Sequence, residues 1–83
     1  MCTYVTTTTP VAGSGYTGDD WFGVDRAVVY FDHPQDAPLD HALCVDVWGS
    51  GGRVAVELDA ASARRLAEAI LGILDHEEVR PLT

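Results

Sequence analysis

The link at residues 49–52, Gly-Ser-Gly-Gly, lies between two stretches of alternating side chains, and this arrangement constrains the fold more than any other feature. Short glycine-dominated links of this kind close β-hairpins. If the link is the loop, Trp48 pairs with Arg53 and Leu43 pairs with Leu58. This register places the valines and leucines of both strands on one face, as a strand pair with one buried side requires.

The preceding segment predicts a second hairpin with the same buried face. Residues 26–33 and 41–48 both alternate in side-chain direction, and residues 34–40 would join them. In this register Phe31 faces Leu43. Because two hairpins inferred separately agree on the apolar side, the sequence predicts an antiparallel β-meander over residues 26–58.

The flanking segments complete an expected α+β fold in a single domain, residues 1–83. Residues 1–9 are rich in threonine and predict either an edge strand or an extended arm, and residues 10–25 predict a glycine-rich loop. Residues 59–78 predict a helix with an N-terminal cap at Asp59 and an apolar face that packs on the sheet. The expected architecture is a meander of three to four strands with one C-terminal helix packed on one face.

The charge of the chain excludes some partners. The net charge is −8, every basic residue is arginine, and the chain contains no lysine. Such a surface repels phosphate groups, which argues against nucleic acid and anionic membranes and favours a cation, a metal or a basic partner. Because no apolar leader or membrane-length apolar run is present, we expect a soluble, cytoplasmic protein. A small domain gains burial by pairing, so a homodimer is also expected.

The polar segment at residues 32–41 carries the most concentrated chemistry. In the register above, His33 and His41 are cross-strand neighbours with Cβ atoms about 4.5 to 5.5 Å apart. Two imidazoles at this distance can share zinc, copper, iron or nickel, and Cys2, Asp32 and Asp36 are candidate further ligands. Two alternatives stay open: each histidine caps the loop, or the pair serves in ligand binding or acid–base chemistry.

The sheet face opposite the helix holds a second candidate surface. Tyr30 and Trp48 fall there together with Cys44. This face can be a platform for a small ligand, an interface between two copies, or a surface covered by the glycine-rich loop.

Three classes of function follow from these residues. The leading hypothesis is a small metal- or small-ligand-binding protein with its site around His33 and His41. An alternative is a small enzyme that uses the same histidine, aspartate and cysteine cluster for acid–base or metal-assisted chemistry on a small molecule. A second alternative is a dimeric interaction module without a site.

Several short motifs carry a resemblance to a known family. They include the opening Met1-Cys2-Thr3-Tyr4, then Asp32-His33-Pro34, Ala37-Pro38 and His41-Ala42-Leu43. Together they resemble an uncharacterised family of short bacterial proteins, a domain of unknown function, over nearly the whole chain. The resemblance implies a self-contained domain and a shared Cys2, His33 and His41 pattern, and it implies nothing about substrate. This chain carries Cys44 where family members tend to carry asparagine, which argues against a shared function for Cys44.

Overall fold

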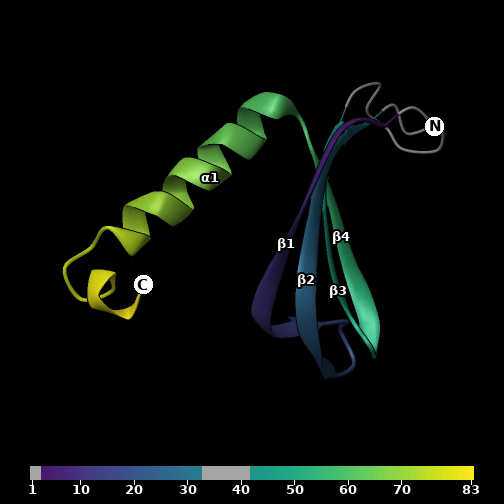
Figure 1. Cartoon of the computed structure of the whole chain (residues 1–83), viewed down its shortest axis with the longest axis horizontal. Helices are drawn as coiled ribbons and strands as arrows, with labels where there is room; N and C mark the ends of the chain where they lie inside the picture. The colour runs from purple at the N-terminus through teal and green to yellow at the C-terminus, as the bar shows by residue number, and fades with distance from the viewer. Residues whose placement is uncertain (1–2, 33–41) are drawn as a thin grey trace.

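The computed structural model describes residues 3–32 and 42–83, which form a four-stranded antiparallel sheet followed by one α-helix and a short 3-10 helix (Figure 1). The strands pair in chain order, so the sheet is a meander. The predicted α+β class with one C-terminal helix is confirmed. The elements are β1 (Thr3–Tyr16), β2 (Trp21–Asp32), β3 (Ala42–Gly49), β4 (Gly52–Leu58), α1 (Ala60–Leu74) and η1 (Arg80–Leu82).

Both predicted registers occur in the sheet. Trp48 pairs with Arg53 and Leu43 with Leu58 across the β3–β4 hairpin, and Phe31 pairs with Leu43 between β2 and β3. A shift of one residue would have moved every apolar side chain to the other face, which is why the alternating pattern specified the register. The β2–β3 ladder is described as far as the pair Asp32 and Ala42.

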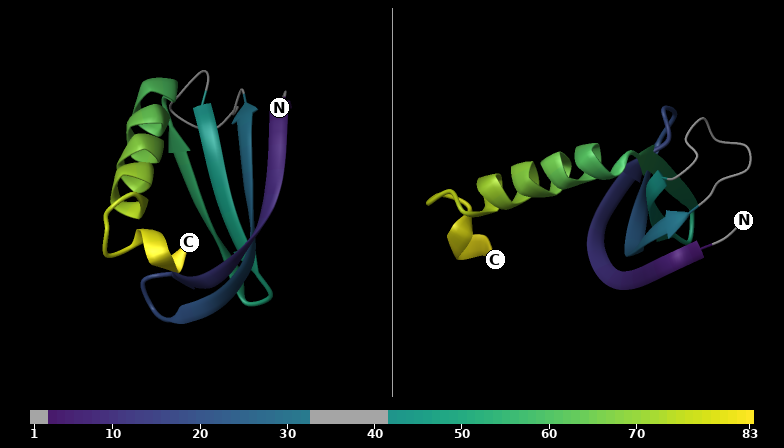
Figure 2. Two further views of the ribbon diagram at one scale, coloured as in Figure 1. Left: turned by 60° about the vertical axis from the view of Figure 1, so that its left-hand side comes forward. Right: turned by 90° about the horizontal axis from the view of Figure 1, so that it is seen from above.

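The prediction of a glycine-rich loop over residues 10–25 is wrong, because strands occupy most of this segment. β1 continues through Pro10 to Tyr16, β2 begins at Trp21, and only residues 17–20 form the turn. β1 is an edge strand, where a proline without an N–H group is tolerated. The register shifts between Pro10 and Gly13, and this bulge accompanies the strong curve of β1 (Figure 2).

Glycines allow close packing at the end of the sheet near the two hairpin turns. A Cβ atom at Gly49 would collide with the carbonyl oxygen of Gly23 on the neighbouring strand. The ring of Phe22 lies against Gly15 and Gly52, where added Cβ atoms would be 3.0 and 3.4 Å from its Cζ atom. The backbones of β2 and β3 therefore approach at Gly49 in a way that leaves no room for a side chain.

Helix α1 begins at a well-formed cap and ends earlier than predicted. The Asp59 carboxylate accepts a hydrogen bond from the Ser62 backbone N–H at 2.6 Å, and this bond lowers the pKa of Asp59. The helix was predicted to reach residue 78, but it ends at Leu74, and the Asp75 N–H closes the last turn on Leu71.

Helix α1 diverges from the sheet after Asp59, the residue that joins β4 to α1. Figures 1 and 2 show α1 and the sheet separating from the end of β4, so the C-terminal half of the helix stands clear. None of the α1 residues is buried, and Ile73 is 65% exposed. Ala63 and Ala67 remain close enough to the sheet to line a groove with Val29 and Leu43.

The position of the most buried residues differs from the expectation that the helix-facing side of the sheet is the buried one. Val45 and Leu58 on that side are only half-buried, whereas Ala42, Cys44 and Asp46 of β3 are buried on the opposite side. The physical reason is the departure of α1, which leaves the helix-facing side partly open. On the opposite side, the small Cys44 side chain lies between its larger cross-strand partners Tyr30 and Glu57.

Candidate functional site

The residues predicted to bind a metal lie almost entirely outside the described part of the chain. This applies to Cys2, His33, Asp36 and His41. Asp32 is the last residue of β2, and its side chain is likewise outside the described residues. Within residues 3–32 and 42–83, no three histidine, cysteine, aspartate or glutamate side chains gather closely enough to hold a metal ion. The predicted metal site therefore stays a prediction.

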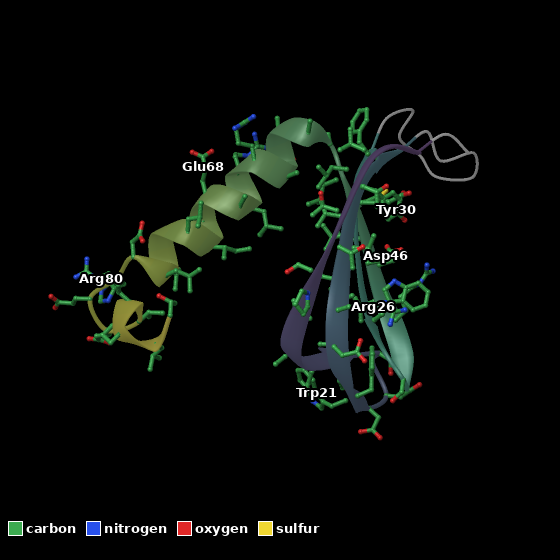
Figure 3. The ribbon with its side chains drawn as sticks, viewed as in Figure 1. Trp21, Arg26, Tyr30, Asp46, Glu68 and Arg80 are labelled. Atoms are coloured by element: carbon green, nitrogen blue, oxygen red, sulfur yellow. The ribbon has the colours of Figure 1, made fainter. Side chains whose placement is uncertain are left out.

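The face opposite α1 carries a connected group of polar side chains centred on Asp46, a residue that is only 6% exposed (Figure 3). The Tyr30 hydroxyl donates a hydrogen bond to Asp46 Oδ2 at 3.1 Å, and Arg53 Nη1 donates to the same oxygen at 3.4 Å. A buried carboxylate is stable only with such partners. Asp46 is thus the residue that links β2, β3 and β4 on this face.

The phenol of Tyr30 is held in its neutral form. Burial, followed by the charge of Asp46 and the hydrogen bond to it, raises the pKa of Tyr30 to about 12. At neutral pH Tyr30 is therefore a hydrogen-bond donor and a poor general base. Its strand neighbour Cys44 is a buried thiol, which lies 3.9 Å from Glu57 Oε2 and 3.8 Å from the Ala42 carbonyl oxygen.

Trp48 lies between two guanidinium groups on the same face. Arg26 on β2 and Arg53 on β4 are its cross-strand partners, and each Cζ atom is 5.1 Å from the indole centroid. Arg26 also contacts Asp25 at 3.5 Å between exposed side chains. The predicted ligand-binding residues Tyr30 and Trp48 are therefore connected through Asp46 and Arg53, and these contacts hold neighbouring strands together.

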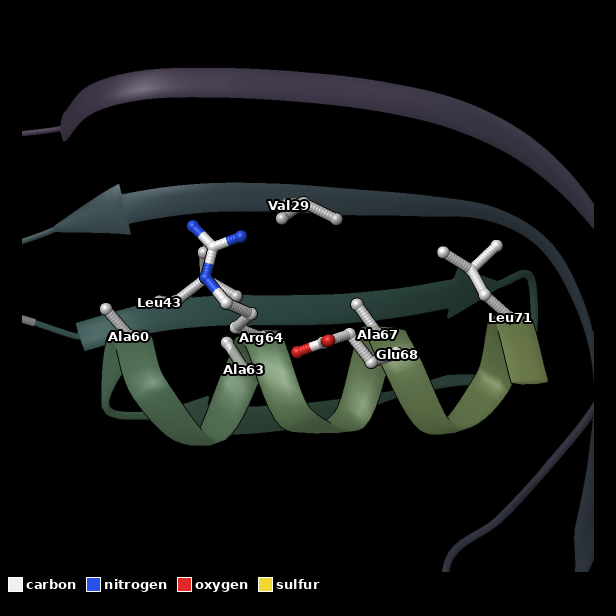
Figure 4. A pocket seen from close by; sticks show the side chains of 8 residues that line it. All are labelled: Val29, Leu43, Ala60, Ala63, Arg64, Ala67, Glu68 and Leu71. Atoms are coloured by element: carbon white, nitrogen blue, oxygen red, sulfur yellow. The ribbon is translucent and has the colours of Figure 1, made fainter. Parts of the chain in front are cut away.

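The helix-facing side of the sheet is different, because it borders an apolar groove (Figure 4). Two adjoining cavities of about 490 and 320 Å³ lie between α1 and the sheet. Both are lined by Val29 and Leu43 from the strands and by Ala63 and Ala67 from the helix. We call this the helix–sheet groove.

The apolar surface continues along α1 beyond the groove. A further hollow of about 360 Å³ is lined by Ala69, Ile70, Ile73 and Leu74, all from the helix. We call the full set of apolar residues along this face the helix stripe, and it consists of Ala63, Leu66, Ala67, Ile70, Ile73 and Leu74. Leu66, Ile70 and Ile73 are each about half exposed or more.

Sequence reasoning missed two of these features. The register already placed Arg26 and Arg53 on either side of Trp48, so the stacked arginines could have been inferred from it. The sequence contains less information about the exposure of the helix stripe. The amphipathic pattern identifies an apolar face, but it does not identify what covers that face.

Comparison with known proteins identifies a family and no activity. Among the described residues, no helix combines the length and the apolar character needed to cross a membrane. Neither a curated protein nor a solved structure matches the chain. The sequence pattern of DUF6295, a family of unknown function, matches residues 1–82, and the chain belongs to this family.

Proposed function

We propose that this domain is a protein-interaction module that works as a homodimer, with the helix stripe and the helix–sheet groove as its interface. The single observation that carries the proposal is the exposure of large apolar side chains along α1, where Ile73 is 65% and Leu66 is 49% exposed. Contiguous apolar patches on small proteins mark interaction surfaces. The interaction class fits better than a pocket for chemistry, because aliphatic side chains form most of the lining of the groove and Arg64 and Glu68 are its charged residues.

The total surface area supports a partner of substantial size. The chain exposes 6184 Å², whereas a folded monomer of 8.9 kDa is expected to expose about 4,800 Å². The excess of about 1,400 Å² exceeds the roughly 800 Å² that each partner buries in a standard protein interface. The radius of gyration, 14.3 Å, is also larger than the value of about 12 Å expected for this length.

The shape of the surface favours a second copy over a small ligand. The 15 residues of α1 span about 22 Å, and the helix stripe follows most of that length, from Ala63 to Leu74. A small ligand in the helix–sheet groove would leave Ile73 and Leu74 in water. A second copy presents an apolar stripe of the same length, and a two-fold dimer covers both stripes at once.

The test is sedimentation equilibrium of the wild-type chain beside two matched variants. Ala67→Glu places a charge in the helix–sheet groove, whereas Ala61→Glu makes the same change on the opposite side of α1. We expect the wild type and Ala61→Glu to be dimers and Ala67→Glu to be a monomer with an unchanged circular dichroism spectrum. A monomeric wild type at about 100 μM, well above a micromolar Kd, would overturn the proposal.

Metal binding at His33 and His41 is a second proposal. What supports it is the β2–β3 register, which follows the predicted pairing up to Asp32 and Ala42. The test is elemental analysis of the untagged protein beside His33→Ala and His41→Ala, with His76→Ala as the control histidine. Stoichiometric zinc, copper, iron or nickel lost only in the first two variants would support the site, and a wild type that takes up none of these metals would exclude it. The enzymatic alternative uses the same residues, and only its metal-assisted form depends on this result.

A further inference from the structure

The charges along α1 run against the helix dipole. The first turn holds no acidic residue and the last turn holds no basic residue. Arg64 and Arg65 lie in the N-terminal half, whereas Asp75 is the C-terminal cap and Glu77 and Glu78 follow it. Cations are favoured at helix C-termini and anions at N-termini. Apart from the Asp59 cap, this helix therefore has a charge order that is unfavourable in isolation.

The same charge order is favourable in an antiparallel pair. Two parallel helices would place their two basic halves at the same height along the pair, whereas antiparallel helices place the basic half of each beside the acidic end of the other. Unlike charges along the flanks set the orientation of paired helices. If α1 pairs antiparallel with a second α1, attraction between unlike charges of the two helices offsets the charge order that is unfavourable within each helix.

The positions of Arg64 and Asp75 fit such a pair. They are eleven residues apart, which is close to three helical turns, so both lie on the same flank of α1. Positions on the same flank face each other when two helices pack antiparallel. Ile70 lies near the midpoint between them and within the helix stripe. Arg64 is also one of the side chains that line the helix–sheet groove (Figure 4).

We propose that two copies of the chain pair through antiparallel α1 helices about a two-fold axis near Ile70, with Arg64 of each copy facing Asp75 of the other. This inference rests on the homodimer proposed above. It specifies the partner's element, its direction and two symmetry-related ion pairs. The apolar stripe supplies the contact area, and the ion pairs select the antiparallel direction.

The test uses charge reversal at the two positions. Arg64→Glu and Asp75→Arg each place like charges opposite each other twice per dimer, so each variant alone should dimerise roughly tenfold more weakly. Both substitutions move the helix towards the charge order that its dipole favours, so loss of the helix is not expected. An equal mixture of the two variants should form heterodimers preferentially, and the double variant should recover wild-type affinity.

The outcomes separate this inference from the proposed function. The readouts are sedimentation equilibrium of each variant and native mass spectrometry of the mixture at low salt, because high salt screens exposed pairs. Arg65→Glu carries the same charge change one residue further around the helix and should leave the dimer affinity unchanged. A monomeric wild type overturns the homodimer itself. A dimeric wild type whose reversed variants form no heterodimer preference overturns the antiparallel arrangement alone.

Discussion

The two sides of the sheet have opposite chemical characters. On the side away from α1, Asp46 is buried and bonded to Tyr30 and Arg53, and Trp48 is flanked by two arginines. On the side towards α1, the apolar side chains of the helix stripe are exposed to solvent. On the first side, these polar and charged side chains find their partners within one copy of the chain. The comparison teaches that polar groups here are satisfied locally, whereas the apolar surface is in excess of what one copy can cover.

The largest expected effect is on the completed sheet, at Gly49. Gly49→Ala should lower the free energy of unfolding by about 3 kcal/mol, because its methyl group would collide with the Gly23 carbonyl oxygen. Gly23→Ala is the matched control, since nothing lies within 4 Å of an added Cβ there. Urea denaturation measures both. Equal stability of the two variants would show that β2 and β3 are not packed as closely as described.

The next effect concerns the buried carboxylate. Asp46→Ala should lower the free energy of unfolding by about 2 kcal/mol, because Tyr30 and Arg53 both lose their acceptor. Asp25→Ala, which removes an exposed partner of Arg26, should cost less than about 0.5 kcal/mol. Thermal denaturation of both variants gives the difference. If Asp25→Ala lowered the free energy of unfolding as much as Asp46→Ala, the buried carboxylate would contribute no more to stability than the exposed one.

A smaller effect follows from the pKa of Tyr30, which is raised from 10.0 to about 12 in the folded chain. The unfolded chain loses this proton first as the pH rises, so the stabilisation is complete below pH 10 and is lost between about pH 10 and 12. We expect a loss on the order of 1 kcal/mol over that range. Urea midpoints from pH 9 to 12 should fall more steeply for the wild type than for Tyr30→Phe, and parallel curves would contradict the shift.

The smallest effect tests the open region. Gly72→Ala should raise the free energy of unfolding by about 0.5 to 1 kcal/mol, because alanine favours the helix. Nothing lies within 4 Å of an added Cβ at Gly72, and the position is opposite the helix stripe. Thermal denaturation measures the gain. Destabilisation by the same methyl group would show that a second molecule also covers the far side of α1.

The sheet could be predicted because its pattern leaves few alternatives. Leu43 and Leu58, like Phe31 and Leu43, share the helix-facing side only in the observed register. The length of β1 could not be predicted from the same rules. Pro10 and Gly13 are typical of loops, and only the position of the strand at the sheet edge makes a bulge there acceptable.

The candidate sites were less predictable. The register placed Asp46 near Tyr30 and Arg53, but burial of the carboxylate depends on how far those side chains reach over it. The direction of α1 after Asp59 depends on backbone angles at one junction, which no periodicity encodes. The histidine pair at residues 33 and 41 rests on the sequence alone, because these residues lie outside the described part of the chain.

The strand order has a consequence for how the chain is made. Each strand pairs with the one that follows it, so all four strands of the sheet have been synthesised once the chain reaches Leu58. Pairing between neighbours in sequence is fast, and chains acquire structure from the N-terminus during translation. Helix α1 follows β4 in the chain, so it emerges from the ribosome after the sheet. Neighbouring nascent chains therefore display finished sheets before they display the surface that we propose brings two copies together.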